Sequence, residues 1–122
     1  MNNNLKTSEI TIATSINPDS RIDIQKEAIE SWIKAGFRVV SLNETKEIKK
    51  LSNTFRNIDF VPQIRTARAL FGKPYIYISD ILAYLRTQNS QISGIINSDI
   101  YLKNTESFSS FLIQEAEKSL IY

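Results

Sequence analysis

Residues 10–42 read ITIATSINPDSRIDIQKEAIESWIKAGFRVVSL, and their pattern decides the fold. Ile10–Thr14 is a short apolar run rich in β-branched residues, which is typical of a buried strand. The apolar positions of the helical pattern that follows are Ile22, Ile29, Trp32 and Ile33. Gly36 ends this helix as a C-terminal glycine does, and Phe37–Leu42 repeats the apolar strand pattern. Strand, helix and strand in this order predict a βαβ unit with parallel strands.

The same alternation continues to the end of the chain. The expected elements are a helix with Ile48, Leu51 and Phe55 inward, a strand at Ile58–Val61, a helix from Ser79-Asp80 with Ile81, Leu82 and Leu85 inward, a strand within Gly94–Leu102, and a helix after Asn104-Thr105 with Phe108, Phe111, Leu112 and Ala116 inward. Four alternations predict an α/β fold: a three-layer, Rossmann-like domain with a mostly parallel sheet of about four strands. We expect the strand order 3-2-1-4, with right-handed crossovers placing helices on both faces.

The bulk composition is that of an ordinary globular protein. The 122 residues carry 23% charged and 42% hydrophobic side chains, so we expect one domain over 1–122, with residues 1–8 flexible. A net charge of +2 is too small to indicate a nucleic-acid or membrane partner. The start has no apolar core of a signal peptide, and no run approaches the roughly 20 apolar residues of a membrane span. A cytoplasmic location is therefore the expectation, and the oligomeric state stays open.

The end of the sequence allows two interpretations. Ser119-Leu120-Ile121-Tyr122 resembles the beginning of another strand, at which the sequence stops. This segment is either a short edge strand, or the sequence is the front part of a longer domain.

The residue types exclude several kinds of site. The chain has no cysteine and no histidine, so thiolate chemistry, an imidazole base and a His-containing zinc site are excluded. A metal would be held by oxygen, which indicates magnesium, manganese or calcium. The three glycines, Gly36, Gly72 and Gly94, cannot build G-x-G-x-x-G or a P-loop.

The strongest functional signal is the triplet Asn97-Ser98-Asp99, which follows the apolar run of the fourth strand. Parallel strands bring their carboxyl ends to one rim, where open α/β sheets bind ligands. Asp99, and more weakly Asn97, are suitable ligands for a hard divalent cation, whereas Ser98 is expected to point the other way. The alternative is that Asp99 is a turn carboxylate that bonds backbone amides.

Further polar residues are expected at the same rim. Thr14-Ser15 follows the first strand and Asn43 the second, while Arg21 opens the first helix. Arg21 either reaches a phosphate or pairs with Asp19 or Asp23.

The long connection after Pro62 contributes three cations, Arg65, Arg68 and Lys73. They could neutralise a diphosphate at this rim. The alternative is a short solvated helix whose arginines face water.

Over residues 9–118 these motifs resemble the amino-terminal, nucleotide-binding half of a GT-A-type glycosyltransferase, of the nucleotide-diphospho-sugar transferase superfamily. The residues that carry the resemblance are Ile12-Ala13-Thr14-Ser15, Arg21 with Gln25, Ala28 and Ser31-Trp32, Gly36–Asn43, Gly72-Lys73-Pro74 and Ile95–Ile100.

The resemblance implies a nucleotide-sugar donor as partner, bound near Thr14, Ser15 and Asn43 at the nucleoside and Arg21 at the phosphates. It implies Mn²⁺ or Mg²⁺ at Asp99 and Asn97. The family has a carboxylate where this sequence has Asn97, and its acceptor-binding half follows the triplet. A glycosyltransferase-like donor domain is therefore expected. The alternative is a non-catalytic fragment or degenerate Rossmann-like domain used for binding or assembly.

Overall fold

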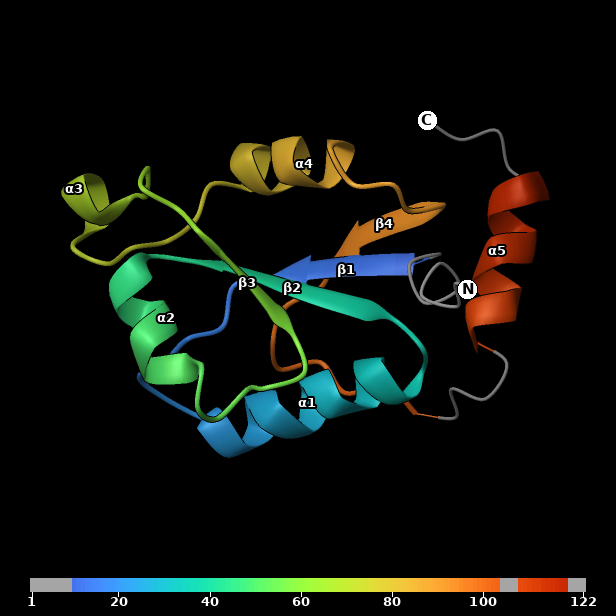
Figure 1. Cartoon of the computed structure of the whole chain (residues 1–122), viewed down its shortest axis with the longest axis horizontal. Coiled ribbons are helices and arrows are strands. Elements are labelled where there is room, and N and C mark those ends of the chain that lie inside the picture. The colour runs from blue at the N-terminus through green and yellow to red at the C-terminus, as the bar shows by residue number, and fades with distance from the viewer. Residues whose placement is uncertain (1–9, 104–107, 119–122) are drawn as a thin grey trace.

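The computed structural model describes residues 10–103 and 108–118, and these residues form an α/β domain around one parallel sheet (Figure 1). The four strands are β1 (Ile10–Thr14), β2 (Arg38–Asn43), β3 (Asp59–Pro62) and β4 (Ile92–Ile95). Their order is β3-β2-β1-β4 and every pairing is parallel. The predicted fold class and strand order are therefore confirmed.

Helices cover both faces of the sheet. The helices are α1 (Ile22–Lys34), α2 (Thr45–Leu51), α3 (Arg68–Phe71), α4 (Ile78–Arg86) and α5 (Phe108–Lys118). In Figure 1 the sheet lies between α1 on one side and α4 on the other. This arrangement is the predicted three-layer one.

Consecutive side chains of each strand pack against opposite helical layers, because side chains alternate between the two faces of a strand. Ile12 and Val39 pack in one core cluster with Ile29 and Trp32 of α1. Ala13, Val40 and Leu42 pack in a second cluster with Ile81 and Leu85 of α4. All five residues of β1 are buried, since this strand has a neighbour on each edge and a helix over each face.

The helices differ from the sequence prediction mainly in which side chains face inward. On α4, Ile81 and Leu85 are buried as expected, but Leu82 is exposed. Leu82 lies about 100° around the helix from Ile81, beside the edge strand β4, and no further described strand lies there to cover it. On α5, Leu112 and Ile113 contact the core, whereas Phe111 and Ala116 are exposed. The expected flexible segment 1–8, the Ser119–Tyr122 strand and the side chain of Phe108 lie outside what the structure describes.

The fourth strand begins and ends earlier than the sequence suggested. Pairing with β1 runs to Ile95, and the amide of Ile96 still donates to the carbonyl of Ala13 at 3.1 Å. The chain then turns, with the Ile100 amide donating to the Asn97 carbonyl at 3.2 Å. The Asn97-Ser98-Asp99 triplet therefore lies in a turn beyond the strand.

We predict that the buried face of α1 carries much of the stability. Ile29 is 1% exposed in the core between α1 and the sheet, so Ile29→Ala should lower the free energy of unfolding by about 3 kcal/mol. The matched control is Ile24→Ala on the same helix, which is 41% exposed and should change stability by less than about 1 kcal/mol. Urea denaturation of the two variants measures both values. Equal effects would contradict the assigned face of α1.

Candidate functional site

A cavity of about 810 Å³ opens at the carboxyl ends of β1 and β4. The chain leaves β1 toward β2 on one side and later returns to β4 on the other, so this is the switch point at which open α/β sheets bind ligands. The lining includes five of the six predicted site residues, Thr14, Ser15, Arg21, Asn97 and Asp99. Its volume is in the range of small-molecule sites.

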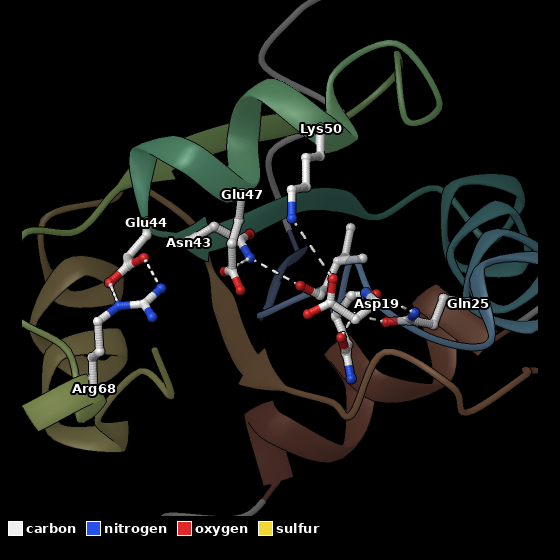
Figure 2. A network of polar contacts seen from close by, with 9 residues as sticks. Asp19, Gln25, Asn43, Glu44, Glu47, Lys50 and Arg68 are labelled. Atoms are coloured by element: carbon white, nitrogen blue, oxygen red, sulfur yellow. Dashed lines mark hydrogen bonds and ion pairs between the residues drawn. The ribbon is translucent and has the colours of Figure 1, made fainter. Parts of the chain in front are cut away.

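The loop after β1 is held by the buried side chain of Gln25. Its Oε1 accepts a hydrogen bond from the amide of Asn17 at 2.8 Å. Its Nε2 donates to the carbonyls of Asn17 at 2.8 Å and Ser20 at 2.9 Å. Figure 2 shows Gln25 reaching from α1 into the loop that carries Asp19. One amide thus satisfies three backbone groups of a loop that has no ladder partner of its own.

The segment after β4 is fixed to α1 by a row of side chains. The hydroxyl of Ser98 donates to Gln25 Oε1 at 2.6 Å, taking the Oγ atom as the donor because the acceptor is an amide oxygen. The indole N–H of Trp32 donates to the carbonyl of Ile100 at 2.8 Å. The amide of Leu102 donates to the Ser31 hydroxyl at 2.9 Å. Ser98 thus contacts α1, but it lines the same cavity as Asn97 and Asp99 and does not point away from them, while Asp99 is left exposed at the cavity.

Arg21 and Asp99 meet across the mouth of the cavity. Nη1 of Arg21 lies 3.5 Å from Oδ2 of Asp99, and both side chains remain about half exposed. Arg21 is the residue that precedes α1, and its φ of 54° is the left-handed conformation that non-glycine residues rarely adopt. Such backbone positions occur preferentially at functional sites, because the surrounding structure must hold them in place. Of the partners considered for Arg21, the structure selects neither Asp19 nor Asp23.

The oxygen atoms of Asp99 and Asn97 are too few to hold a metal ion by themselves, but they could hold one that is also bound by a ligand. In the described part of the chain, no three His, Cys, Asp or Glu side chains are grouped closely enough to hold an ion. Magnesium is commonly bound through one or two carboxylates together with substrate phosphates and water. Asp99 with the amide oxygen of Asn97 therefore fits a cation shared with a diphosphate, and does not make a protein-only site.

Asn43 lies beneath the cavity and not in its wall. Its side chain is fully buried, accepting from the hydroxyl of Ser41 at 2.6 Å and donating to the carbonyl of Ile16 at 2.9 Å. It also donates to Oε1 of Glu47 at 2.8 Å, as Figure 2 shows. Since Ser41 Oγ accepts from the amide of Ile16 at 3.0 Å, the two side chains hold the backbone of Ile16 at both its polar groups. Asn43 thus supports the loop after β1, and a bound ligand would not touch it directly.

Glu47 is the acidic group of the cavity that sequence reasoning missed. It lies on α2, is half buried, and lines the same cavity as Arg21. Burial raises the pKa of its carboxyl, and the nearby charges of Glu44 and Asp19 raise it further, while the Asn43 hydrogen bond offsets part of the shift. A shifted carboxyl in a cleft is a candidate functional group. Four-residue spacing from Asn43 was its one sequence signal.

Of the three cations in the long connection, only Lys73 lines the cavity. The connection contains the short helix α3, as the alternative interpretation predicted. Arg68 pairs with Glu44 at 2.6 Å, which lowers the pKa of that carboxyl (Figure 2). Arg65 lies 3.2 Å from Asp80 and over the ring of Tyr77, at 4.6 Å from its centroid.

Comparison of the chain with protein-family models, with curated proteins and with solved structures gives no match. Among the helices that the structure describes, none is both long and apolar enough to cross a membrane.

We predict that Gln25→Glu breaks the link between α1 and the two loops. The new carboxylate keeps an acceptor for Asn17, but it sets a second acceptor against the carbonyls of Asn17 and Ser20. The free energy of unfolding should fall by about 2–4 kcal/mol near pH 7 and recover in part near pH 5, where a protonated carboxyl donates again. Gln91→Glu, at an exposed position, is the matched control and should change stability by less than about 0.5 kcal/mol. Full stability of the Gln25 variant near pH 7 would contradict the assigned role.

We predict a pH-dependent gain from Glu47→Gln. A carboxyl whose folded-state pKa is raised stabilises the fold below its unfolded pKa, and that contribution is lost as pH rises through the folded pKa. The glutamine keeps an acceptor for Asn43 and cannot ionise, so its stability relative to the native chain should increase from about pH 4 to about pH 7. Thermal unfolding at both pH values measures the difference. Glu27→Gln on the exposed side of α1 controls for loss of a surface charge, and a gain that does not depend on pH would exclude this cause.

Proposed function

We propose that the cavity binds a nucleotide-diphospho-sugar, and that the chain is the donor-binding part of a glycosyltransferase-like domain. The observation that supports this most is the convergence of Thr14-Ser15, Arg21, Lys73 and Asn97–Asp99 on one cavity. These residues come from four separate parts of the sequence. The cavity is lined by two cations, Arg21 and Lys73, and by three carboxylates, Asp19, Glu47 and Asp99. Cations bind the phosphates of a diphosphate, and a carboxylate such as Asp99 binds a metal ion shared with them.

In this proposal the two cations bind the diphosphate. Arg21 offers a planar fork of N–H donors, and such a fork pairs with two phosphate oxygens at once. Its present partner, Asp99, is 3.5 Å away and half exposed, so the contact is easily exchanged for a phosphate. Lys73, in the connection between β3 and α4, supplies a second positive charge to the cavity. Ser15 offers a partly exposed hydroxyl group to the nucleoside, next to the buried Thr14 at the end of β1. The backbone of the loop that follows is already held by Gln25, Ser41 and Asn43.

Mn²⁺ or Mg²⁺ is proposed at Asp99, with Asn97 as a further oxygen donor. When bound, such an ion supplies Lewis-acid stabilisation of the negative charge on the departing diphosphate. The role of this chain is to hold the Asp99 carboxylate at the cavity mouth, which the contacts of Ser98, Ile100 and Leu102 with α1 accomplish. Arg21 orients the phosphates beside it.

The test is a thermal-shift screen with uridine-, guanosine- and thymidine-diphosphate sugars, with manganese or with a chelator. At about one hundred times Kd, the matching ligand should raise Tm by roughly 10 °C. We expect part of this shift to require manganese, and manganese without nucleotide to give none, because the protein donors are too few. Asp99→Asn should remove the manganese-dependent part and retain the rest.

The matched control is Asp23→Asn, an exposed carboxylate in the first turn of α1 that does not line the cavity. It should leave both parts of the shift unchanged. Absence of a shift with every nucleotide-sugar, with and without manganese, would overturn the proposal and favour the binding or assembly domain considered from the sequence.

A further inference from the structure

A second surface of the molecule, which adjoins the donor site, carries exposed apolar side chains. Residues 64–75, called the 64–75 projection below, connect β3 to α4 and include α3. Ile64 is fully exposed, and Leu70, Phe71 and Tyr75 are 71%, 65% and 55% exposed. Large apolar groups gathered on a protein surface mark a site of interaction with another body.

The projection is an ordered unit of its own. The amide of Ala67 donates to the carbonyl of Tyr75 at 2.8 Å, which closes the loop around α3. The rings of Phe71 and Tyr75 lie side by side, with centroids 6.2 Å apart. Gly72, with a φ of 74°, allows the turn that ends α3. In Figure 1 α3 lies at one end of the molecule, away from the sheet, and α5 lies at the other.

The charged side chains within the projection itself are all cationic. From residue 60 to residue 79 the sequence contains Arg65, Arg68 and Lys73 and no aspartate or glutamate. The chain's net charge of +2 conceals this concentration. Two of the cations are paired, but their carboxylate partners lie deeper: Arg68 is 53% exposed against 17% for Glu44, and Arg65 67% against 26% for Asp80. The groups presented outward are therefore guanidinium, ammonium and apolar.

We infer that the 64–75 projection docks the protein on the surface of an anionic phospholipid membrane. Leucine, isoleucine and aromatic side chains enter the boundary between head groups and acyl chains, while arginine and lysine remain among the anionic head groups. Arg65 and Arg68 stay more than half exposed beside their partners Asp80 and Glu44, so both guanidinium groups can also reach anionic head groups. The inference concerns a surface contact and not a membrane span, and it does not depend on the proposed nucleotide-sugar site.

The position of the projection gives the docking a consequence. Lys73 and Tyr75 belong both to the projection and to the lining of the cavity. Docking through Leu70 and Phe71 therefore places one side of the cavity mouth next to the lipid surface. Whatever the cavity binds is then held at the boundary of the membrane.

The test is co-sedimentation of the purified chain with vesicles. We expect binding to vesicles of phosphatidylcholine mixed with phosphatidylglycerol, and at least about fivefold weaker binding to phosphatidylcholine alone. Raising the salt concentration should weaken binding to the anionic vesicles, because it screens exposed charges. The double variant Leu70→Ser, Phe71→Ser should reduce the partition coefficient by at least about tenfold.

The matched control is Phe111→Ser, which removes an exposed aromatic side chain from α5 at the other end of the molecule. It should bind vesicles as the native chain does. Circular dichroism and thermal unfolding establish that each variant is folded. Failure of the native chain to bind anionic vesicles would overturn the inference, as would full binding by the double variant. Self-association in sedimentation velocity that the double variant abolishes, without vesicle binding, would identify the projection as a protein interface instead.

Discussion

The burial of β1 on all sides is the constraint on which the rest of the structure depends. Its five residues pair in parallel with β2 on one edge and with β4 on the other. A strand in that position needs a layer over each face, and α1 and α4 provide the two layers through separate core clusters. The chain must cross from one side of β1 to the other to complete the sheet. That crossing creates the switch point at which the cavity opens.

Hydrogen bonds from α1 convert this scaffold into a site. Gln25, Ser31 and Trp32 are buried, and each uses a polar atom to hold backbone or side-chain groups of the loops after β1 and β4. Burying an amide without partners would cost free energy, so these contacts are as demanding as core packing. They leave Arg21 and Asp99 exposed while fixing the backbone on which each lies. The exposed pair is thus free to exchange partners although its framework is rigid.

The strands could be predicted well from the sequence and the polar contacts only poorly, for physical reasons. The apolar runs around Ile12 and Val40 identify the buried strands β1 and β2, and the shorter run at Val61 identifies the partly exposed edge strand β3. Gly36 ended α1 as expected, and its φ of 94° is the reason a glycine is suited there. Leu82 and Phe111 were assigned inward because helical periodicity cannot tell whether a neighbour exists to cover a given face. Glu47 and Gln25 were not assigned to the site, because a single polar residue in a helical pattern is normally expected to face the solvent.

By itself, the sequence determined the fold class, the order of the elements and the rim at which Thr14, Ser15, Arg21 and Asp99 would meet. The local sequence pattern is enough to predict these features, because apolar periodicity, turn residues and the right-handed crossover rule are compatible with only a few topologies. Only the tertiary structure decided which polar side chains contact one another. Arg21 faces Asp99, Asn43 lies under the cavity beside Glu47, and Arg68 turns to Glu44. The contacts of Arg21 with Asp99 and of Arg68 with Glu44 join residues far apart in the chain, so they follow from how the strands and their loops are packed and not from any local signal.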